Sequence, residues 1–160
     1  MYCSNCEMTL ATITYAHNEA YNGGTFYITN PITPIGLVQS GISISNSKAY
    51  WNGGAFYVSG TTTQTLDIST ITVTTTWASN FGGMMYVDNP NQSLLAGDLS
   101  VTSASSSTSG GVFYFNQISA VTIKKITSGS IFSQLSAPVL GSFMCSVATT
   151  LNLAISGSTV

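Results

Sequence analysis

The sequence carries very little charge. Of its 160 residues only 5% are Asp, Glu, Lys or Arg, whereas an ordinary globular protein has about a quarter. Arginine is absent and the lysines are Lys48, Lys124 and Lys125, so no basic surface exists that could neutralise phosphates. We therefore expect no nucleic-acid partner, and the formal net charge of -2 is too small to steer a charged ligand.

Targeting and membrane-spanning segments are also missing. The N-terminal residues "MYCSNCEMTL" have no basic stretch followed by an apolar run, so no signal peptide is predicted. No residue from Ile126 to Val160 is charged, but Pro138, Asn152 and the Thr149-Thr150 pair interrupt this part of the chain. We predict strands here and no membrane span.

The residues that are present favour β-structure. Hydrophobic residues make up 44% of the chain, and 24 Ser and 22 Thr often alternate with Ile, Val or Leu. Such alternation places one set of side chains in a core and the other in solvent. The length suits one domain covering residues 1–160.

A glycine pair recurs along the chain. The phrases "NGGTFY", "NGGAFY", "FGGMMY" and "SGGVFY" begin at positions 22, 52, 81 and 109, so the pairs follow each other at steps of 30, 29 and 28 residues. Periods of this size indicate a solenoid. Because corners need positive φ or close backbone approach, we assign structural corners to these glycines: Gly23, Gly24, Gly53, Gly54, Gly82, Gly83, Gly110 and Gly111.

Each glycine pair is followed by an apolar strand with an outward Tyr, and a second strand precedes it by about nine to twelve residues, as at Ile42-Ser43-Ile44. A third short strand, as at Leu66-Asp67-Ile68, completes a triangular cross-section in at least one coil and is indistinct elsewhere. We predict an all-β, right-handed parallel β-solenoid of about five coils of 28–31 residues. The fifth coil is assigned to Gly141, with "TSGSIFSQLSAP" as an insertion at one edge.

Residues 15–27, from Tyr15 and Asn18 to the first glycine pair and Tyr27, resemble the FxxN…GGA(I/L/V)Y repeat of the chlamydial polymorphic membrane proteins. They are also similar to GGAIY-bearing repeat proteins of ciliates and other protists. The resemblance covers positions 12–117 through the glycine pairs, although Lys48 and Trp77 fall where Asn18 would recur. It implies a pectin-lyase-like right-handed β-helix that serves as a surface adhesin or coat material.

No cluster of reactive side chains is predicted. Carbohydrate hydrolysis needs carboxylates within roughly 5 to 10 Å of each other. The acids lie at different phases of the repeat: Glu7, Glu19, Asp67, Asp88 and Asp98. The single histidine, His17, is interpreted as a surface or corner residue. We expect no enzyme activity, no catalytic residue and no cofactor.

The cysteines are Cys3, Cys6 and Cys145. The Cys3-x-x-Cys6 spacing suits a disulfide, a redox pair or half of a zinc site. About four layers of the solenoid, roughly 19 Å, should separate Cys145 from Cys3, so one zinc ion could not bind all the cysteines. A structural disulfide between Cys3 and Cys6, or two free thiols, is therefore favoured over a metal site.

Outward aromatic residues form the candidate binding surface, for a glycan or a protein partner. They are the tyrosines that follow the glycine pairs and one tryptophan: Tyr27, Tyr57, Tyr86, Tyr114 and Trp51. Stacked rings could bind sugar rings or a neighbouring filament. The alternative is that the tyrosines stack only because the repeat copies them. In the binding interpretation, replacing Tyr57 and Tyr86 with Ser would abolish binding.

A second array consists of hydroxyl residues on the strands before the corners: Thr12/Thr14, Ser43/Ser45, Thr72/Thr74 and Ser100/Thr102. It resembles the flat TxT faces of ice-binding β-solenoids, although Ser at half of the positions lacks the methyl group. Ordinary solvated strand faces are the favoured interpretation.

The composition and the lack of reactive clusters together favour a non-catalytic structural protein of the cell surface or exterior. It would build a coat, stalk or filament by end-to-end stacking with itself or with adjoining coils, and could be adhesive. The chain is then a fragment or a stacking unit of a longer assembly. A carbohydrate-binding module is the alternative. Asn91-Gln92-Ser93 is a candidate N-glycosylation site if the chain is secreted.

Overall fold

The computed structural model describes residues 1–6, 13–31, 35–36, 42–68, 70–124, 131–147 and 152–156. In these ranges the chain forms β-strands and no helix, so no helix is available to cross a membrane. All pairings between the strands are parallel, and most strands pair with the strand three places further along the chain. This topology confirms the predicted parallel β-solenoid.

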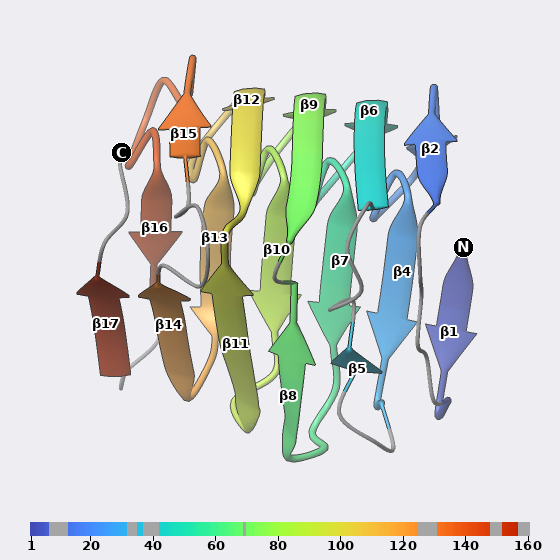
Figure 1. Ribbon diagram of the computed structural model, residues 1–160, viewed down its shortest axis with the longest axis vertical. Helices are drawn as coiled ribbons and strands as arrows, with labels where there is room; N and C mark the ends of the chain where they lie inside the picture. Colours follow the sequence, from blue (N-terminus) through green and yellow to red (C-terminus); the bar gives the residue numbers. More distant parts are fainter. Residues whose placement is uncertain are drawn as a thin grey trace.

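The strands form three sheets that run along the solenoid (Figure 1). Sheet A includes the four strands that follow the glycine pairs. It contains β1 (Tyr2–Ser4), β4 (Phe26–Thr29), β7 (Phe56–Ser59), β10 (Met85–Asp88), β13 (Phe113–Gln117) and β16 (Met144–Ser146). Sheet B contains β5 (Ile35–Gly36), β8 (Gln64–Asp67), β11 (Gln92–Gly97), β14 (Ala120–Lys124) and β17 (Asn152–Ser156). Sheet C contains β2 (Thr14–Ala16), β3 (Glu19–Ala20), β6 (Ile42–Ala49), β9 (Ile71–Ala78), β12 (Ser100–Ser106) and β15 (Ile131–Ser133).

The coils wind in a right-handed sense. In Figure 1 they advance from the N-terminal end on the right to the C-terminal end on the left. The nearer strands of sheet B run upward, and the strands of sheet A behind them run downward. The number of coils differs slightly from the prediction of about five. Within the described residues, about four coils contain a strand of every sheet, and incomplete coils lie at both ends.

The core consists of apolar columns, because in-register stacking places like side chains above each other. Phe26 pairs with Phe56, and the two rings stack with centroids 5.0 Å apart. From sheet B, Leu66, Leu94 and Val121 form a second column. All five side chains are fully or almost fully buried, and each such residue contributes roughly 1.5–3 kcal/mol through removal of its apolar surface from water.

The glycine pairs perform two separate tasks at the corners. The first glycine of each pair has a left-handed backbone, with φ of 58° at Gly23 and 67° at Gly53. The second glycine permits a close approach between coils: a Cβ atom on Gly54 would lie 1.9 Å from the carbonyl oxygen of Gly83 in the next coil. Gly141 continues the series with φ of 57°. The assignment of the fifth corner to Gly141 therefore agrees with the structure.

Sheet C contains a bend that we did not predict. One residue per coil adopts a left-handed conformation with φ between 50° and 57°: His17, Asn46, Thr75, Ser103 and Gln134. In β6 the inward positions change at this bend from Ile42 and Ile44 to Ser47 and Ala49. The left-handed residue adds one outward position and bends the chain. Each long strand of sheet C therefore forms two sides of its coil, one before the bend and one after it.

The predicted third strand recurs along the solenoid as sheet B, and β8 includes the predicted Leu66 and Asp67. One part of the predicted layout is wrong. The segment "TSGSIFSQLSAP" is not an insertion throughout, because its residues 131–133 form β15 and pair with β12 as a regular part of sheet C. Its residues 127–130 lie outside the described residues.

The first corner is one residue shorter than the next. Glu19 pairs with Lys48, and the backbone N–H of Lys48 donates to the carbonyl of Asn18. Asn18 is therefore equivalent to the buried Ser47, and not to Lys48 and Trp77 as counting back from the glycines predicted. Asn18, the asparagine of the FxxN resemblance, thus stacks with the polar residues Ser47 and Thr76 beside the glycine corner.

The close approach at the corners can be tested with Gly54→Ala. Gly54 has no left-handed backbone, so the variant isolates the clash with the Gly83 carbonyl. Since the obstacle is backbone, we expect the free energy of unfolding to fall by at least about 3 kcal/mol. Denaturant unfolding measures this, with Ser107→Ala at an exposed turn position as the control. An unchanged midpoint for Gly54→Ala would refute the role of this corner.

Candidate functional site

The tyrosines that follow the glycine pairs form one continuous column. Tyr27, Tyr57, Tyr86 and Tyr114 are register partners on successive strands of sheet A. The column is longer than predicted, because Tyr2 pairs with Tyr27 at the N-terminal end. Tyr2 lacks the glycine signature in front of it, so the repeat pattern did not reveal it. At the other end Tyr114 pairs with the free, buried thiol of Cys145.

The rings of this column cover each other's faces. Centroid separations are 4.8 Å for Tyr27 and Tyr57, 5.2 Å for Tyr57 and Tyr86, and 5.6 Å for Tyr86 and Tyr114. The corresponding ring planes lie within 18° of parallel. A sugar stacks on the face of an aromatic ring, so within the column only ring edges and hydroxyl groups remain for a lateral ligand. The predicted lateral stacking of sugars on these tyrosines is therefore disfavoured.

Exposure also decreases along the column. Tyr2 is 70% exposed, Tyr27 and Tyr57 are half-buried, and Tyr86 and Tyr114 are each only 8% exposed. Phe81, which precedes a glycine pair, stacks on Tyr114 with centroids 4.3 Å apart. The C-terminal half of the column is thus a second small core, and only its N-terminal half is accessible.

Burial changes the ionisation of the column. Burial raises the pKa of the Tyr86 phenol well above its ordinary value, and Asp88 and the neighbouring tyrosines raise it further. The pKa of Tyr57 is raised by burial, by Tyr27 and by Asp88, while a hydrogen bond with Ser59 opposes the shift. The Tyr57 and Tyr86 phenols are therefore neutral under ordinary conditions.

A second aromatic group lies at the corner between sheet C and the glycines, and we call Tyr21, Tyr50 and Trp51 the corner patch. Their side chains are 66%, 49% and 46% exposed. The Tyr21 and Trp51 rings are 10° from parallel, with centroids 6.3 Å apart. Trp51 was a predicted site residue, and the structure places it with Tyr21 and Tyr50 in one exposed group.

Two charged residues flank the corner patch. The Lys48 ammonium lies 4.5 Å from the centroid of the Tyr50 ring and 5.4 Å from that of Trp77. The Tyr50 hydroxyl donates a hydrogen bond to the Glu19 carboxylate. Both charges are thereby held against aromatic groups, and the patch as a whole is electrically neutral.

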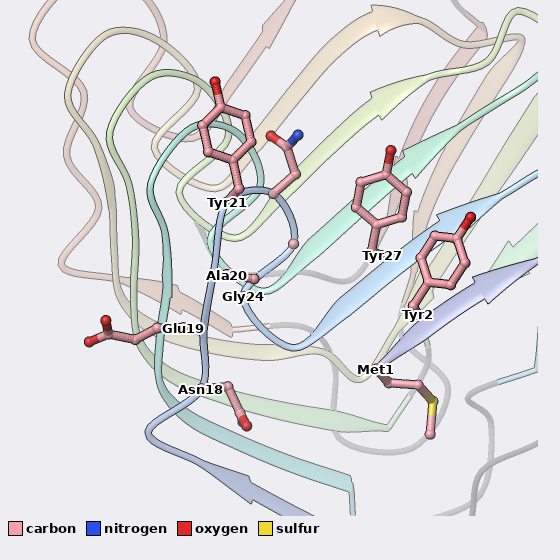
Figure 2. A pocket seen from close by; sticks show the side chains of 10 residues that line it. Met1, Tyr2, Asn18, Glu19, Ala20, Tyr21, Gly24 and Tyr27 are labelled. Carbon is pink, nitrogen blue, oxygen red and sulfur yellow. The ribbon is translucent and has the colours of Figure 1, made fainter.

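A hollow adjoins the patch at the N-terminal end. It has a volume of about 580 Å³, and its lining includes Tyr2, Tyr21, Tyr27 and Glu19. Figure 2 shows the three tyrosine rings directed to the same side of the ribbon, with Glu19 directed away from them. At its floor the buried Asn18 side-chain nitrogen has no hydrogen-bond partner among the described residues.

The described acids are dispersed over the structure. Glu19 lies on β3, Asp67 ends β8, Asp88 ends β10, and Asp98 lies between β11 and β12. The partner of the Asp88 carboxylate is a neutral side chain, since it accepts a hydrogen bond of 3.0 Å from Asn116. Glu7 lies outside the described residues. Within the described ranges no group of three His, Cys, Asp or Glu side chains is arranged to bind a metal ion.

The histidine and cysteines occupy structural positions. His17 is exposed at the left-handed bend of sheet C. Cys3 and Cys6 form a disulfide with Cα atoms 5.8 Å apart. Cys145 is five strands from Cys3 in sheet A, about 24 Å at the usual strand spacing and one layer more than predicted. A shared metal site with Cys3 is geometrically excluded.

Two further predicted surfaces can be placed. In the hydroxyl array the first layer is displaced, since Thr14 pairs with Ser43, and Ala16 pairs with Ser45. Thr12 lies outside the described residues. Asn91 of the candidate glycosylation site is exposed, and its side-chain nitrogen donates to the carbonyl of Thr61 at 2.7 Å. The use of either surface stays a prediction.

Comparison with known proteins finds no matching family model, no matching curated protein and no matching solved structure. The relationship to GGA(I/L/V)Y-repeat proteins therefore stays a prediction that rests on the sequence motif.

The ionisation of the tyrosine column predicts a pH dependence of stability. A tyrosine whose pKa is raised on folding stabilises the fold fully below its unfolded pKa of about 10, and this stability is lost as the pH rises through the folded value. We expect the free energy of unfolding to fall above about pH 10, and Tyr86→Phe to reduce this fall. Denaturant unfolding from neutral to alkaline pH measures it. An equal loss in Tyr86→Phe would contradict the assignment to Tyr86.

Proposed function

We propose that the chain is a non-catalytic structural module of a cell-surface or extracellular coat, stalk or filament. Its end coils stack on copies of itself or on adjoining solenoid coils, so that the solenoid continues beyond these 160 residues. The low charge and the aromatic columns support this proposal, because both suit indefinite stacking of like layers. The Cys3–Cys6 disulfide supports an oxidising, exterior compartment.

The observation that carries the proposal is the distribution of exposed apolar side chains. Apart from Tyr50 and Trp51, the large exposed apolar residues among the described residues belong to the two end coils: Met1, Tyr2, Ile13, Tyr21, Val139, Leu140, Val147 and Leu153. An apolar surface confined to the two ends favours association along the axis rather than sideways.

Leu153 illustrates why these ends require a cover. It pairs with Val121, which is fully buried, and it continues the core column of Leu66 and Leu94. Nevertheless Leu153 is 43% exposed because no described coil lies beyond it. Another coil placed on this face would bury a position that is core everywhere else. The contact is heterologous, since the two end faces differ, and such contacts generate filaments when they do not close into rings.

Assembly can be tested with charges on the C-terminal end face. We expect the purified chain to form elongated particles of uniform width by electron microscopy and to sediment as concentration-dependent oligomers. The double variant Val139→Lys and Leu153→Lys should raise the dissociation constant of association at least about 10-fold, because it places two charges in an apolar contact.

The control carries the same charges on the side of the solenoid. Thr72→Lys and Thr74→Lys alter exposed positions of β9, so association should be unchanged in this variant. A wild-type chain that stays monomeric at millimolar concentration would overturn the proposal. Equal loss of association in both double variants would show that net charge, and not the end face, is responsible.

A further inference from the structure

We propose that the corner patch of Tyr21, Tyr50 and Trp51 binds a neutral polysaccharide. The first argument is that the patch is not required by the fold. In a solenoid, residues with a structural role recur in each coil, as the glycine pairs do. The backbone N–H of Asn80 donates to the Trp51 carbonyl, and that of Thr108 donates to the Asn80 carbonyl, which makes these three residues equivalent. The following coils thus form the same corner without an aromatic residue at this position.

The second argument is exposure in the interior of the solenoid. Tyr50 and Trp51 follow β6, which has neighbouring strands on both sides, so their exposure of 49% and 46% does not result from an uncovered end. A coil stacked on the N-terminal face would cover the hollow beside Tyr21 but would leave these two rings accessible. Tyr50 and Trp51 therefore stay accessible in the filament proposed above, whereas Tyr21 belongs to the end coil and would lie beside the stacked copy.

The third argument concerns the accessible ring faces. In the tyrosine column each interior ring lies between two other rings. Trp51 has only Tyr21 as a stacked partner among the described aromatic residues, and Asn80 follows it in the next coil. One face of the indole is thus free of aromatic cover. The C–H face of a pyranose ring packs on such a surface, which the interior rings of the tyrosine column do not offer.

The charges and polar groups around the patch indicate the class of ligand. Glu19 and Lys48 are of opposite sign and are engaged with Tyr50, so an anionic or cationic ligand finds no net complement. A neutral polar side chain follows Trp51 in the next coil, where Asn80 accepts a hydrogen bond of 3.2 Å from the Thr108 hydroxyl. Apolar faces bordered by neutral donors and acceptors match a neutral sugar polymer.

The repeat itself supplies a variant that preserves the fold. Tyr50→Ser combined with Trp51→Asn gives this corner the residues that the next coil carries at Ser79 and Asn80. Binding would be measured by calorimetry with soluble oligosaccharides of β-1,4-glucan, β-1,3-glucan, chitin and mannan, and with a sulfated glycan as the charged comparison. We expect the wild-type chain to bind at least one neutral oligosaccharide, and the double variant to lose at least about 10-fold in affinity.

Two controls separate this site from the rest of the surface. Tyr57→Phe retains the stacked column and removes one hydroxyl group, so it should bind as the wild type does. The double variant should unfold at the same denaturant concentration as the wild type and should still form filaments. The proposal is overturned if no neutral oligosaccharide binds, if only the sulfated glycan binds, or if the double variant binds with unchanged affinity. Each of these outcomes leaves the assembly test unaffected.

Discussion

The parallel, in-register hydrogen bonding between coils is the constraint on which the structure depends. It places each residue directly above its equivalent, about 4.8 Å away, so a side chain at a recurring position must tolerate a copy of itself. Aromatic and aliphatic side chains satisfy this condition by stacking, as Phe26 does on Phe56 and Tyr57 on Tyr86. Like charges at this distance repel each other.

The same constraint explains the scarcity of charge. No two of the described acids are paired in the sheets, and each paired charge has neutral or opposite neighbours. Asp67 lies between Gly36 and Leu95, Asp88 between Ser59 and Gln117, and Lys48 between Glu19 and Trp77. The low charge, which we first used to exclude nucleic acid, is thus primarily a consequence of the architecture.

The sequence predicted the features that recur with a recognisable residue type. Glycine pairs revealed the corners and the axial period because only glycine tolerates both the backbone angle and the close contact found there. The bend of sheet C stayed hidden, since five different residue types occupy it, from His17 to Gln134. Its trace in the sequence is indirect: in β6 the buried positions Ile44 and Ser47 are three residues apart instead of two.

The candidate site followed the opposite rule. The tyrosine column was predictable from the sequence because its residues recur with the glycine pairs. Recurrence in a solenoid, however, marks residues that the fold needs, and the rings of this column cover each other's faces. Trp51 was predicted as a binding residue together with the column, but Tyr50 and Trp51 have Ser79 and Asn80 as their equivalents in the next coil and so do not follow the repeat. The following coils form this corner without aromatic residues at these two positions, so the fold does not explain the presence of Tyr50 and Trp51. Exposed aromatic surface on an otherwise hydroxyl-rich face is typical of a binding site, and the proposed glycan site accounts for it.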